Sequence, residues 1–409
     1  MSLVVQKYGG TSIRDIERIK AVAHRCLATQ QKGHDLVVVL SAMAGETNRL
    51  LELAGQITNS PEPREMDMLI STGEQVSISL LAITIQALGG KARSFLADQM
   101  GMRTDNLYGK ARILSVDDKK VRKALEDGEV VIVAGFQGVD AEGNITTLGR
   151  GGSDTTAVAL AAALHADVCE IYTDVDGIYT TDPSLCADAK KIKRIAYEEM
   201  MELASLGAKI LQVRSVEFGM NYGVPIHVRS SFEEREGSWV IPEEVSMEKV
   251  RVRGVACDLK AAKITIRGVP DIPGVAAKIF RPLAGAGINV DVIIQNVSEG
   301  GVTDVTFTVS REDLELARTI SQEIVETMAA QGTRVDERVA KVSLVGVGMR
   351  SHAGVAAQAF DALAEANINI QMISTSEIKI SCVVAEDDAP LAVQVLHGAF
   401  HLGSAEAAK

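Results

Sequence analysis

An internal repeat constrains the fold of this chain more strongly than any other feature of its sequence. Residues 274–290 and 354–370 align without a gap at a constant offset of 80, and ten of the 17 aligned residues are identical. Each copy holds a helix-forming stretch between strand-like runs, which predicts two β-α-β-β units of the ferredoxin-like type. Gly287 and Asn367 occupy matching positions and are expected to end the two helices in the left-handed conformation. From the pattern alone, a ligand-binding pair and a scaffold that only stacks are equally open.

The residues before the repeat follow a different pattern, in which short apolar runs alternate with longer helix-forming stretches. This alternation predicts an α/β domain with a mostly parallel central sheet that carries helices on both faces. The expected strands are 3–6, 36–40, 130–134, 145–148 and 170–173, and the expected helices are 15–29, 73–88, 121–127 and 154–165.

A polar and acidic segment, residues 230–248, separates the two regions and predicts a domain boundary. We therefore expect a first domain over residues 1–245 and two ferredoxin-like domains over 250–335 and 336–409. In an alternative arrangement, the C-terminal segment completes the first of the two repeat domains.

The composition excludes several classes of protein. The 409 residues carry a net charge of −12, which argues against nucleic-acid binding. The sequence has no run of 18 apolar residues and no signal peptide, so we expect a cytoplasmic protein that does not bind a membrane. The five cysteines are scattered and lack metal-ligand spacing, which predicts reduced thiols and no metal-binding residues.

Residues 7–12, Lys-Tyr-Gly-Gly-Thr-Ser, form a strand end, a glycine turn and the start of a helix. Glycine lets the main chain approach a ligand closely, amides at a helix start attract phosphate, and Lys7 adds a positive charge. These features favour a phosphate site, although an ordinary turn with Ser12 as helix cap fits the same residues. The Walker glycine loop and the protein-kinase motifs are absent from the sequence, so the phosphate site is of another kind.

Residues 147–156 repeat the order of strand, glycine turn and helix, and they make the strongest active-site candidate. Arg150 stands between glycines in the turn, and its planar guanidinium is suited to bind a carboxylate through two hydrogen bonds. Ser153 and Asp154 stand where the helix begins, and either one fits equally well as a helix cap. A cap leaves Arg150 unexplained, so an anion site is favoured here.

Two further polar loops follow early strands. Residues 41–48 come directly after a strand, at the end of the sheet where open α/β folds bind ligands, and offer the hydroxyls of Ser41 and Thr47. Residues 72–75, Thr-Gly-Glu-Gln, fit a capping box, which leaves Glu74 to bind an ammonium group. Helix capping explains the first loop as well as substrate binding does, and it explains the second loop better.

Residues 173–183 contain an Asp-x-Asp-Gly stretch after another strand. The later ligand positions of a calcium-binding EF-hand are missing, so a nucleoside-binding loop fits better, with aspartates on the ribose or base and Tyr179 packed nearby. Lys209 follows a further helix-forming stretch and is interpreted as a second phosphate-binding lysine, although a surface lysine is the commoner case.

Together these motifs resemble those of the aspartokinase family, and they occur in the family's order. The resemblance covers essentially the whole chain, and the chain is most similar to the monofunctional bacterial form of the family. Arg14 is a mild departure, because relatives have a small residue at this position. The C-terminal repeat resembles paired ACT domains. The motifs that carry the resemblance are residues 5–13, 39–43, 71–74, 149–154 and 172–177.

The resemblance implies the amino-acid-kinase fold, a three-layer α/β sandwich. It also implies the reaction: ATP, with Mg²⁺, phosphorylates L-aspartate to 4-phospho-L-aspartate, the first step of lysine, threonine and methionine biosynthesis. Two alternatives stay open, namely another enzyme of the amino-acid-kinase family and a non-catalytic amino-acid sensor.

The resemblance also assigns roles to residues of the kinase half. Lys7 and the amides of Gly9 and Gly10 would hold the ATP phosphates, Arg150 would clamp a substrate carboxylate, and Asp154 would orient the lysines. The expected catalytic residues are Lys7, Arg150, Asp154 and Lys209; the expected substrate-binding residues are Ser41, Thr47, Glu74, Arg150, Gly151, Gly152 and Ser153; the expected nucleotide-binding residues are Lys7, Tyr8, Gly9, Gly10, Ser41, Thr173, Asp174, Tyr179, Asp182 and Lys209.

The paired ACT domains imply feedback control by lysine, threonine or both, and association of the chain into a homo-oligomer. Met247 is a candidate internal start that would produce a separate regulatory subunit. Asp271 or Asp291 would bind the effector's ammonium group. The expected effector-binding residues are Asp271, Gly274, Val275, Ala276, Asn289, Asp291, Gln295, Asn296, Asn369, Ser376 and Glu377.

Overall fold

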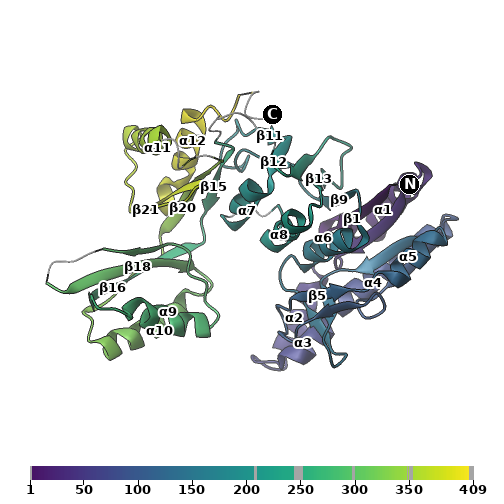
Figure 1. The fold of residues 1–409 in the computed structure, drawn as a ribbon, viewed down its shortest axis with the longest axis horizontal. Helices are drawn as coiled ribbons and strands as arrows, with labels where there is room; N and C mark the ends of the chain where they lie inside the picture. The colour runs from purple at the N-terminus through teal and green to yellow at the C-terminus, as the bar shows by residue number, and fades with distance from the viewer. Residues whose placement is uncertain are drawn as a thin grey trace.

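The computed structural model describes residues 2–206, 210–243, 252–296, 300–347, 349 and 353–404. An N-terminal α/β module, purple to teal in Figure 1, lies beside two smaller modules coloured green and yellow. Lys209 and Met247, which the sequence singled out, lie outside the described residues.

In the described residues, the N-terminal module is built on a sheet of eight strands in the order β12-β14-β13-β9-β1-β2-β6-β3. The strands from β13 to β3 run parallel, and β14 is antiparallel to β13. The predicted mostly parallel sheet is therefore confirmed. Its strands are β1 (Leu3–Tyr8), β2 (Asp35–Leu40), β3 (Ala92–Phe95), β6 (Val130–Ala134), β9 (Val168–Thr173), β12 (Arg194–Ala196), β13 (Ile226–Ser230) and β14 (Ser238–Ile241).

One face of this sheet is covered by α1 (Ile16–Gln31) and α4 (Thr72–Ala87). Successive side chains of a strand point to opposite faces, so Val4 and Tyr8 of β1 both point into this core. Both helices bury apolar side chains there, which fixes their position over β1, β2 and β6.

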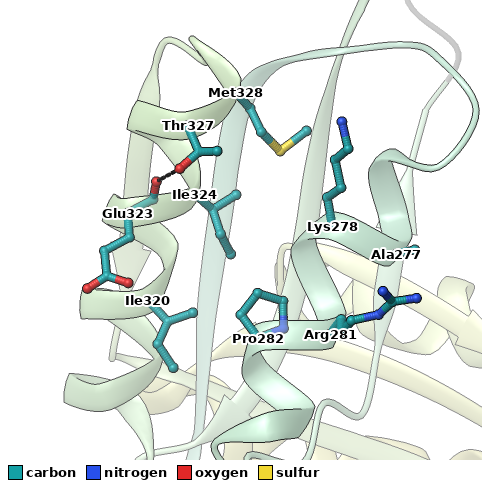
Figure 2. A pocket seen from close by; sticks show the side chains of 9 residues that line it. All are labelled: Ala277, Lys278, Arg281, Pro282, Ile320, Glu323, Ile324, Thr327 and Met328. Atoms are coloured by element: carbon teal, nitrogen blue, oxygen red, sulfur yellow. Dashed lines mark hydrogen bonds between the residues drawn. The ribbon is translucent and has the colours of Figure 1, made fainter.

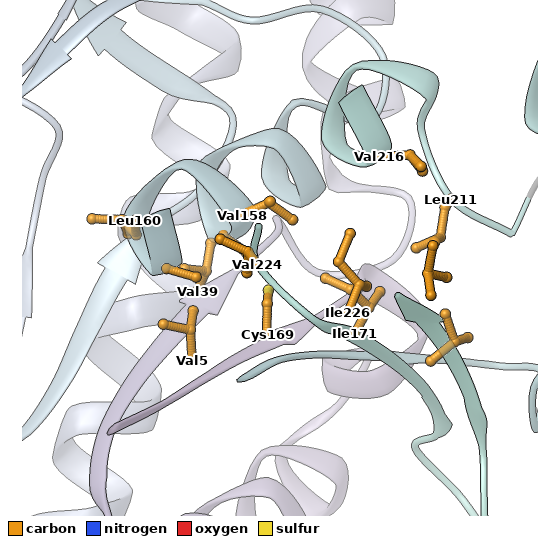
Figure 3. Packing of buried hydrophobic residues seen from close by; sticks show 14 of the residues in the cluster. Val5, Val39, Val158, Leu160, Cys169, Ile171, Leu211, Val216, Val224 and Ile226 are labelled. Carbon is orange, nitrogen blue, oxygen red and sulfur yellow. The ribbon is translucent and has the colours of Figure 1, made fainter. Parts of the chain in front are cut away.

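The opposite face is covered by α6 (Gly152–Leu164) and α8 (Val213–Tyr222). Figure 3 shows Val5 and Val39, from neighbouring parallel strands, packed among residues of these helices. Lys7 lies on the same face of β1 as Val5, because the two residues are two positions apart. The alternation of β1 therefore directs Lys7 towards α6.

The strand predicted over residues 145–148 does not join the central sheet. It forms β8 (Ile145–Thr147), which pairs antiparallel with β7 (Gln137–Val139) in a small sheet of order β5-β4-β7-β8. A hairpin turn with Gly143 at φ 89° reverses the chain here, so no helix intervenes and no parallel pairing follows. The remaining elements of the module are β4 (Met102–Thr104), β5 (Ile113–Val116), β10 (Ile178–Tyr179), β11 (Lys191–Ile192), η1 (Gly10–Ile13), α2 (Glu46–Gly55), α3 (Pro63–Ile70), α5 (Lys119–Glu126) and α7 (Tyr197–Ser205).

Two helix starts differ from the expected caps. Asp15 caps α1 by accepting a main-chain hydrogen bond, and Ser12 lies in the preceding turn η1 instead. The capping box expected at Thr72 does not form, because α3 continues through Ser71, in the right-handed helical conformation, almost directly into α4. The first amides of α4 therefore have carbonyl partners in α3 and need no side-chain cap.

One described stretch, Pro63–Ala87, is long and apolar enough to cross a membrane by length and composition alone. It consists of α3 and α4, and half of its most apolar window is buried inside the fold. Core helices pass the same test, and α4 packs here against α1 and the central sheet.

Each copy of the repeat forms a four-stranded sheet with two helices, which confirms the ferredoxin-like prediction. Gly287 and Asn367 follow α9 and α11 with φ of 76° and 56°, which confirms the left-handed caps. The first module contains β16 (Ala261–Pro270), α9 (Val275–Gly285), β17 (Ile293–Gln295), β18 (Val302–Ser310), α10 (Leu314–Met328) and β19 (Gly332–Asp336); the second contains β20 (Val339–Val345), α11 (Ala353–Glu365), β21 (Met372–Thr375), β22 (Lys379–Ala385), η3 (Glu386–Asp388) and α12 (Ala389–Ala399).

The strand that precedes the first repeat module belongs to the second one. β15 (Gly254–Asp258) pairs with β20 and takes the outer position that β19 occupies in the first sheet. The C-terminal segment therefore completes the module that β15 begins, and not the module formed by β16–β19. In the first sheet, β19 follows α10 and occupies the edge beside β16. The corresponding edge of the second sheet, beside β20, is occupied by β15.

The second repeat module is docked directly on the N-terminal module. The Val255 N–H of β15 donates to the Thr180 carbonyl at 2.7 Å, and the Thr180 hydroxyl lies 2.9 Å from His397 Nε2 of α12. Lys379 and Glu202 form an ion pair across the same boundary at 3.1 Å. The loop that follows β9 is thus in contact with the repeat.

Candidate active site

The predicted motifs meet at the carboxyl ends of the central strands, the edge where open α/β sheets bind ligands. The loops after β1, β2 and β6 and the start of α6 surround a cavity of about 320 Å³, called here the substrate cavity. Its lining includes the predicted residues Lys7, Gly10, Ser41, Thr47, Glu74, Arg150, Gly151, Gly152 and Ser153, together with Ala42, Met43, Ala44, Gly45, Asn48, Phe136 and Gly149.

Lys7 and Asp154 form a close ion pair at one wall of this cavity. Lys7 Nζ lies 2.6 Å from Asp154 Oδ1, and the two side chains are only 12% and 11% exposed. A charge in such a place is held firmly by its partner, because water solvates it poorly. Gly9 lies beside the same ammonium, since a Cβ at Gly9 would be 3.6 Å from Nζ. Asp154 therefore holds the Lys7 ammonium in a fixed position next to the glycine turn.

The glycines around the cavity are required for close packing of its walls. A Cβ at Gly10 would lie 2.8 Å from the carbonyl oxygen of Ala42, and a Cβ at Gly73 would lie 2.7 Å from the Ala42 side chain. Neither position has room for a larger residue without movement of main chain. The loops after β1 and β2 and the start of α4 therefore meet backbone to backbone.

Glu74 is a buried carboxylate with one unsatisfied oxygen. It is 3% exposed, and its Oε1 accepts a hydrogen bond from the Ala42 N–H at 3.0 Å. Its Oε2 is buried without a hydrogen-bond partner among the described residues. Burial raises the pKa of Glu74 to about 7. A buried carboxylate oxygen of this kind is stabilised by a cationic donor, such as an ammonium group that enters the cavity.

Arg150 stands in a turn between two glycines that adopt the left-handed conformation, Gly149 at φ 78° and Gly151 at φ 70°. Gly151 is the residue that precedes α6, and no described side chain caps this helix. The alternative in which Ser153 or Asp154 acts as the cap is therefore wrong. Ser153 lines the substrate cavity, and Asp154 contacts Lys7 instead.

A second cavity, of about 890 Å³, lies beside the first at the ends of β9 and β13, and is called here the nucleotide cavity. The predicted residues Thr173, Asp174, Tyr179 and Asp182 line it. The Tyr179 hydroxyl donates to Asp176 at 2.7 Å, which fixes the ring at the cavity wall. Strand β15 of the second repeat module also lines this cavity, so the repeat contributes to its wall.

Asp182 has a partner in its own turn, because its Oδ1 accepts hydrogen bonds from the N–H and the hydroxyl of Ser184 at 2.8 and 2.7 Å. The two cavities are neighbours, since the Gly9 N–H donates to the Tyr172 carbonyl of β9 at 3.4 Å. A ligand that filled the nucleotide cavity could therefore extend towards Lys7.

The side chain of Tyr8 is buried, so the expected nucleotide contact of this residue is limited to its main chain. Its ring is fully buried in the core under α1 and stacks on Tyr172 with the ring centroids 4.7 Å apart. The alternation of β1 points Tyr8 to the face opposite Lys7, so only its main chain faces the glycine turn.

Two of the expected effector residues already have contacts within the chain. The carboxylate of Asp291 already pairs with the ammonium of Lys341, a β20 side chain that is 4% exposed. Val275 is 3% exposed and packs in the core of the first repeat module. The Gly274 turn, at φ 90°, precedes α9. The remaining candidates are exposed at the surface of this chain: Asp271, Ala276, Asn289, Gln295, Asn296, Asn369, Ser376 and Glu377.

A groove of about 470 Å³ lies between α9 and α10 of the first repeat module. Figure 2 shows Ile320, Ile324 and Met328 pointing into it, and the Thr327 hydroxyl donating to the Glu323 carbonyl at 2.8 Å. Its lining contains none of the candidate effector residues. The groove and the candidate effector site are therefore different surfaces.

The sequence prediction missed Phe136, which lines the substrate cavity at the end of β6. It adopts φ 69°, an unusual conformation for a bulky side chain and one that often marks a functional site. A glycine followed by an aromatic residue directly after an apolar strand is the signal that could have indicated it. Asp67 and Arg214 were also missed: Asp67 accepts from the Thr147 N–H at 2.7 Å, and Arg214 donates to the Leu148 carbonyl at 2.7 Å.

Comparisons with known proteins agree with this geometry. The model of the amino acid kinase family matches residues 2–230, and ACT domain models match residues 264–322 and 342–400. The aspartate kinase of Pseudomonas putida is 55% identical over 403 residues, which cover 98% of each chain.

Solved structures are similar over nearly the whole chain. E. coli aspartokinase III in complex with aspartate and ADP, in the R-state, has a TM-score of 0.81 and 30% identity, covering 97% of this chain and 99% of that one. The same enzyme with lysine and aspartate, in the T-state, has a TM-score of 0.75 and 29% identity, with the same coverage.

An α/β kinase module joined to two ACT domains defines the class of the amino acid kinases that carry a regulatory region. Within that class, the chain belongs to the aspartate kinases.

Proposed function

We propose that L-aspartate binds in the substrate cavity and ATP in the nucleotide cavity, for the ATP-dependent phosphorylation of L-aspartate that aspartate kinases perform. One observation supports this assignment most directly: Glu74, which carries a carboxylate, and Arg150, which carries a guanidinium, line the same cavity. An amino acid carries the two complementary charges, an ammonium and a carboxylate. A dicarboxylic amino acid leaves its second carboxylate to meet the phosphoryl group.

The proposed chemistry is a direct transfer. A β-carboxylate oxygen of aspartate, which is ionised at neutral pH, attacks the γ-phosphorus of ATP and needs no general base. The bond from the γ-phosphorus to the bridging oxygen breaks, and ADP leaves with the electron pair. Lys7, held by Asp154, neutralises charge on the transferred group, and Arg150 with Ser153 orients the substrate. The product is 4-phospho-L-aspartate.

Mg²⁺ is proposed to bind together with ATP and to neutralise phosphate charge. Asp174 and Asp182 line the nucleotide cavity and offer carboxylate oxygens, which are the ligands this ion prefers. The described residues contain no group of three His, Cys, Asp or Glu side chains able to hold a metal. This fits an ion held mainly by the nucleotide phosphates.

The regulatory proposal concerns the two ACT modules. Lysine, threonine or both are proposed to bind the exposed candidate residues there, in a chain that associates into a homo-oligomer in the cytoplasm. Support comes from the wall that β15 contributes to the nucleotide cavity and from the contact between His397 and Thr180. A change in the second repeat module would reach ATP through these contacts. The proposed domain limits are 1–245 for the kinase domain and 250–335 and 336–409 for the two ACT domains, except that strand β15, within 250–335, joins the sheet of the last domain. A regulatory subunit would begin at Met247.

Arg150→Ala tests the proposed substrate site. Loss of a charge-assisted pair of hydrogen bonds should raise the KM for aspartate by about 10- to 100-fold, with little change in the KM for ATP. The matched control is Arg49→Ala, which removes an exposed cation that pairs with Glu46 outside the cavity lining. Unchanged aspartate kinetics in the Arg150 variant would overturn the clamp role of this residue.

A further inference from the structure

We infer that Asp67 is a positioning residue that fixes the turn carrying Arg150 in the geometry required for the substrate carboxylate. This inference rests on the proposed role of Arg150. Asp67 lies on α3, is 1% exposed and does not line the substrate cavity. It can therefore influence the substrate only through other residues.

The carboxylate of Asp67 collects three hydrogen bonds from two segments of the chain. Its Oδ2 accepts from the Thr147 N–H at 2.7 Å and from the Gly109 N–H at 2.8 Å. Its Oδ1 accepts from the Thr147 hydroxyl at 2.7 Å. Hydrogen bonds to an ionised acceptor are about twice as strong as neutral ones, so the end of β8 is held firmly three residues before Arg150.

Gly109 transmits the same restraint to the turn by direct contact. A Cβ at Gly149 would lie 3.0 Å from the Gly109 carbonyl oxygen, so the two main chains are in close contact. Asp67 therefore positions both the strand that enters the turn and the loop that packs against it.

The opposite side of the turn is held from α8. Arg214 donates to the Leu148 carbonyl at 2.7 Å and to the Ala111 carbonyl at 3.0 Å. Gln212 donates to the Arg150 carbonyl at 2.6 Å. A turn with two left-handed glycines has little rigidity of its own, so these contacts from α3 and α8 set where Arg150 stands. Small displacements of a substrate-binding group reduce rates strongly.

A purely structural role for Asp67 in the small sheet is the alternative, and a double-mutant cycle separates the two. Asp67→Asn keeps the size of the side chain but has one acceptor oxygen for three donors. In the full-length chain, we expect this variant to raise the KM for aspartate by about 10-fold or more, with the KM for ATP changed less than about twofold. If Asp67 acts through Arg150, adding Asp67→Asn to Arg150→Ala should produce no further effect on aspartate. Effects that multiply in full would overturn the inference.

The control for sheet stability is Thr104→Val. It removes one hydroxyl of the buried Thr104–Thr146 pair, 2.6 Å apart, in the same small sheet, and leaves every donor to Asp67 in place. It should lower the melting temperature and leave the KM for aspartate unchanged. A rise in that KM comparable with the Asp67 variant would show that sheet stability alone is responsible, and would overturn the inference.

Thr147→Val keeps the test decisive if Asp67→Asn does not fold. It removes a single donor to Asp67 and leaves the carboxylate and both main-chain contacts in place. The KM for aspartate should rise several-fold, and an unchanged value overturns the inference. Failure of the proposed function would look different. An Arg150→Ala variant with wild-type aspartate kinetics would contradict the role of Arg150 in substrate binding. Independent effects of the Asp67 and Arg150 substitutions would contradict only the positioning role of Asp67.

Discussion

Replacing Glu74 by glutamine should stabilise the ligand-free enzyme while it removes aspartate binding, and both effects should depend on pH. Burial raises the pKa of Glu74 from 4.5 to about 7, because water no longer solvates the ionised carboxylate. Glutamine keeps the acceptor for the Ala42 N–H and has no charge to desolvate. The variant thus removes the free-energy cost of burying an ionised carboxylate in the empty cavity.

The magnitude follows from the shift. About 2.5 pKa units, at 1.36 kcal/mol each, correspond to about 3 kcal/mol of folding stability. The folded protein binds this proton more tightly than the unfolded chain, so wild-type stability falls as pH rises from 4.5 to 7 and stays lower above 7. The Glu74→Gln protein should therefore be about 3 kcal/mol more stable than wild type at pH 8. At pH 5 the difference should be below about 1 kcal/mol.

Denaturant unfolding of both proteins, without ligands, at pH 5 and pH 8 measures this difference, and each protein serves as its own control across pH. Kinetics supply the second readout. Wild-type kcat/KM for aspartate should fall about tenfold per pH unit below 7, because only ionised Glu74 binds an ammonium group. The variant should show a low value without this slope. A variant that is less stable than wild type at pH 8, or a stability difference that is the same at both pH values, would refute the reasoning.

Three further substitutions test separate parts of the account. Lys7→Met should lower kcat about 100-fold or more in an ADP-release assay, because the fixed charge beside the glycine turn is lost; a tenfold effect or less would contradict it. Gly10→Ala should destabilise the protein by about 1–3 kcal/mol in thermal unfolding, since its Cβ would lie 2.8 Å from a carbonyl oxygen, whereas Gly55→Ala, in open space on α2, should not. His397→Ala should raise the KM for ATP a few-fold through its contact with Thr180, and a larger change in the KM for aspartate would argue against this route.

The organisation of the chain could be predicted from sequence where local patterns determine it. The repeat predicted two ferredoxin-like units, and the alternation of apolar runs predicted the parallel sheet, because each depends on residues close together in the chain. The partner of β15 could not be predicted, since a five-residue strand carries no signal for which sheet edge it joins. The same limit applies to β8, whose three residues pair in a separate sheet.

The candidate site also combines residues that the sequence could predict with residues that only the fold reveals. Lys7 and Arg150 were predicted because glycine turns after strands indicate ligand contacts, and Glu74 was predicted because the expected capping box left it without a role. For Tyr8, the motif does not say which face of the strand the side chain takes; the ring is buried, and only the main chain is left to contact a ligand. Asp67 was missed since two of its three partners are main-chain amides, which any residue supplies, and they stand 42 and 80 positions away. Only the fold brings such groups together.

The central claim is that the protein uses ATP to phosphorylate a carboxylate of L-aspartate bound in the substrate cavity. Hydroxylamine trapping of the acyl phosphate in the full-length protein tests it most directly, with L-aspartate compared against L-glutamate and an acylated glutamate at equal concentration. The account predicts ATP-dependent aspartyl hydroxamate that is reduced when lysine or threonine is added. No trapped product with aspartate, together with product from another acid, would contradict it.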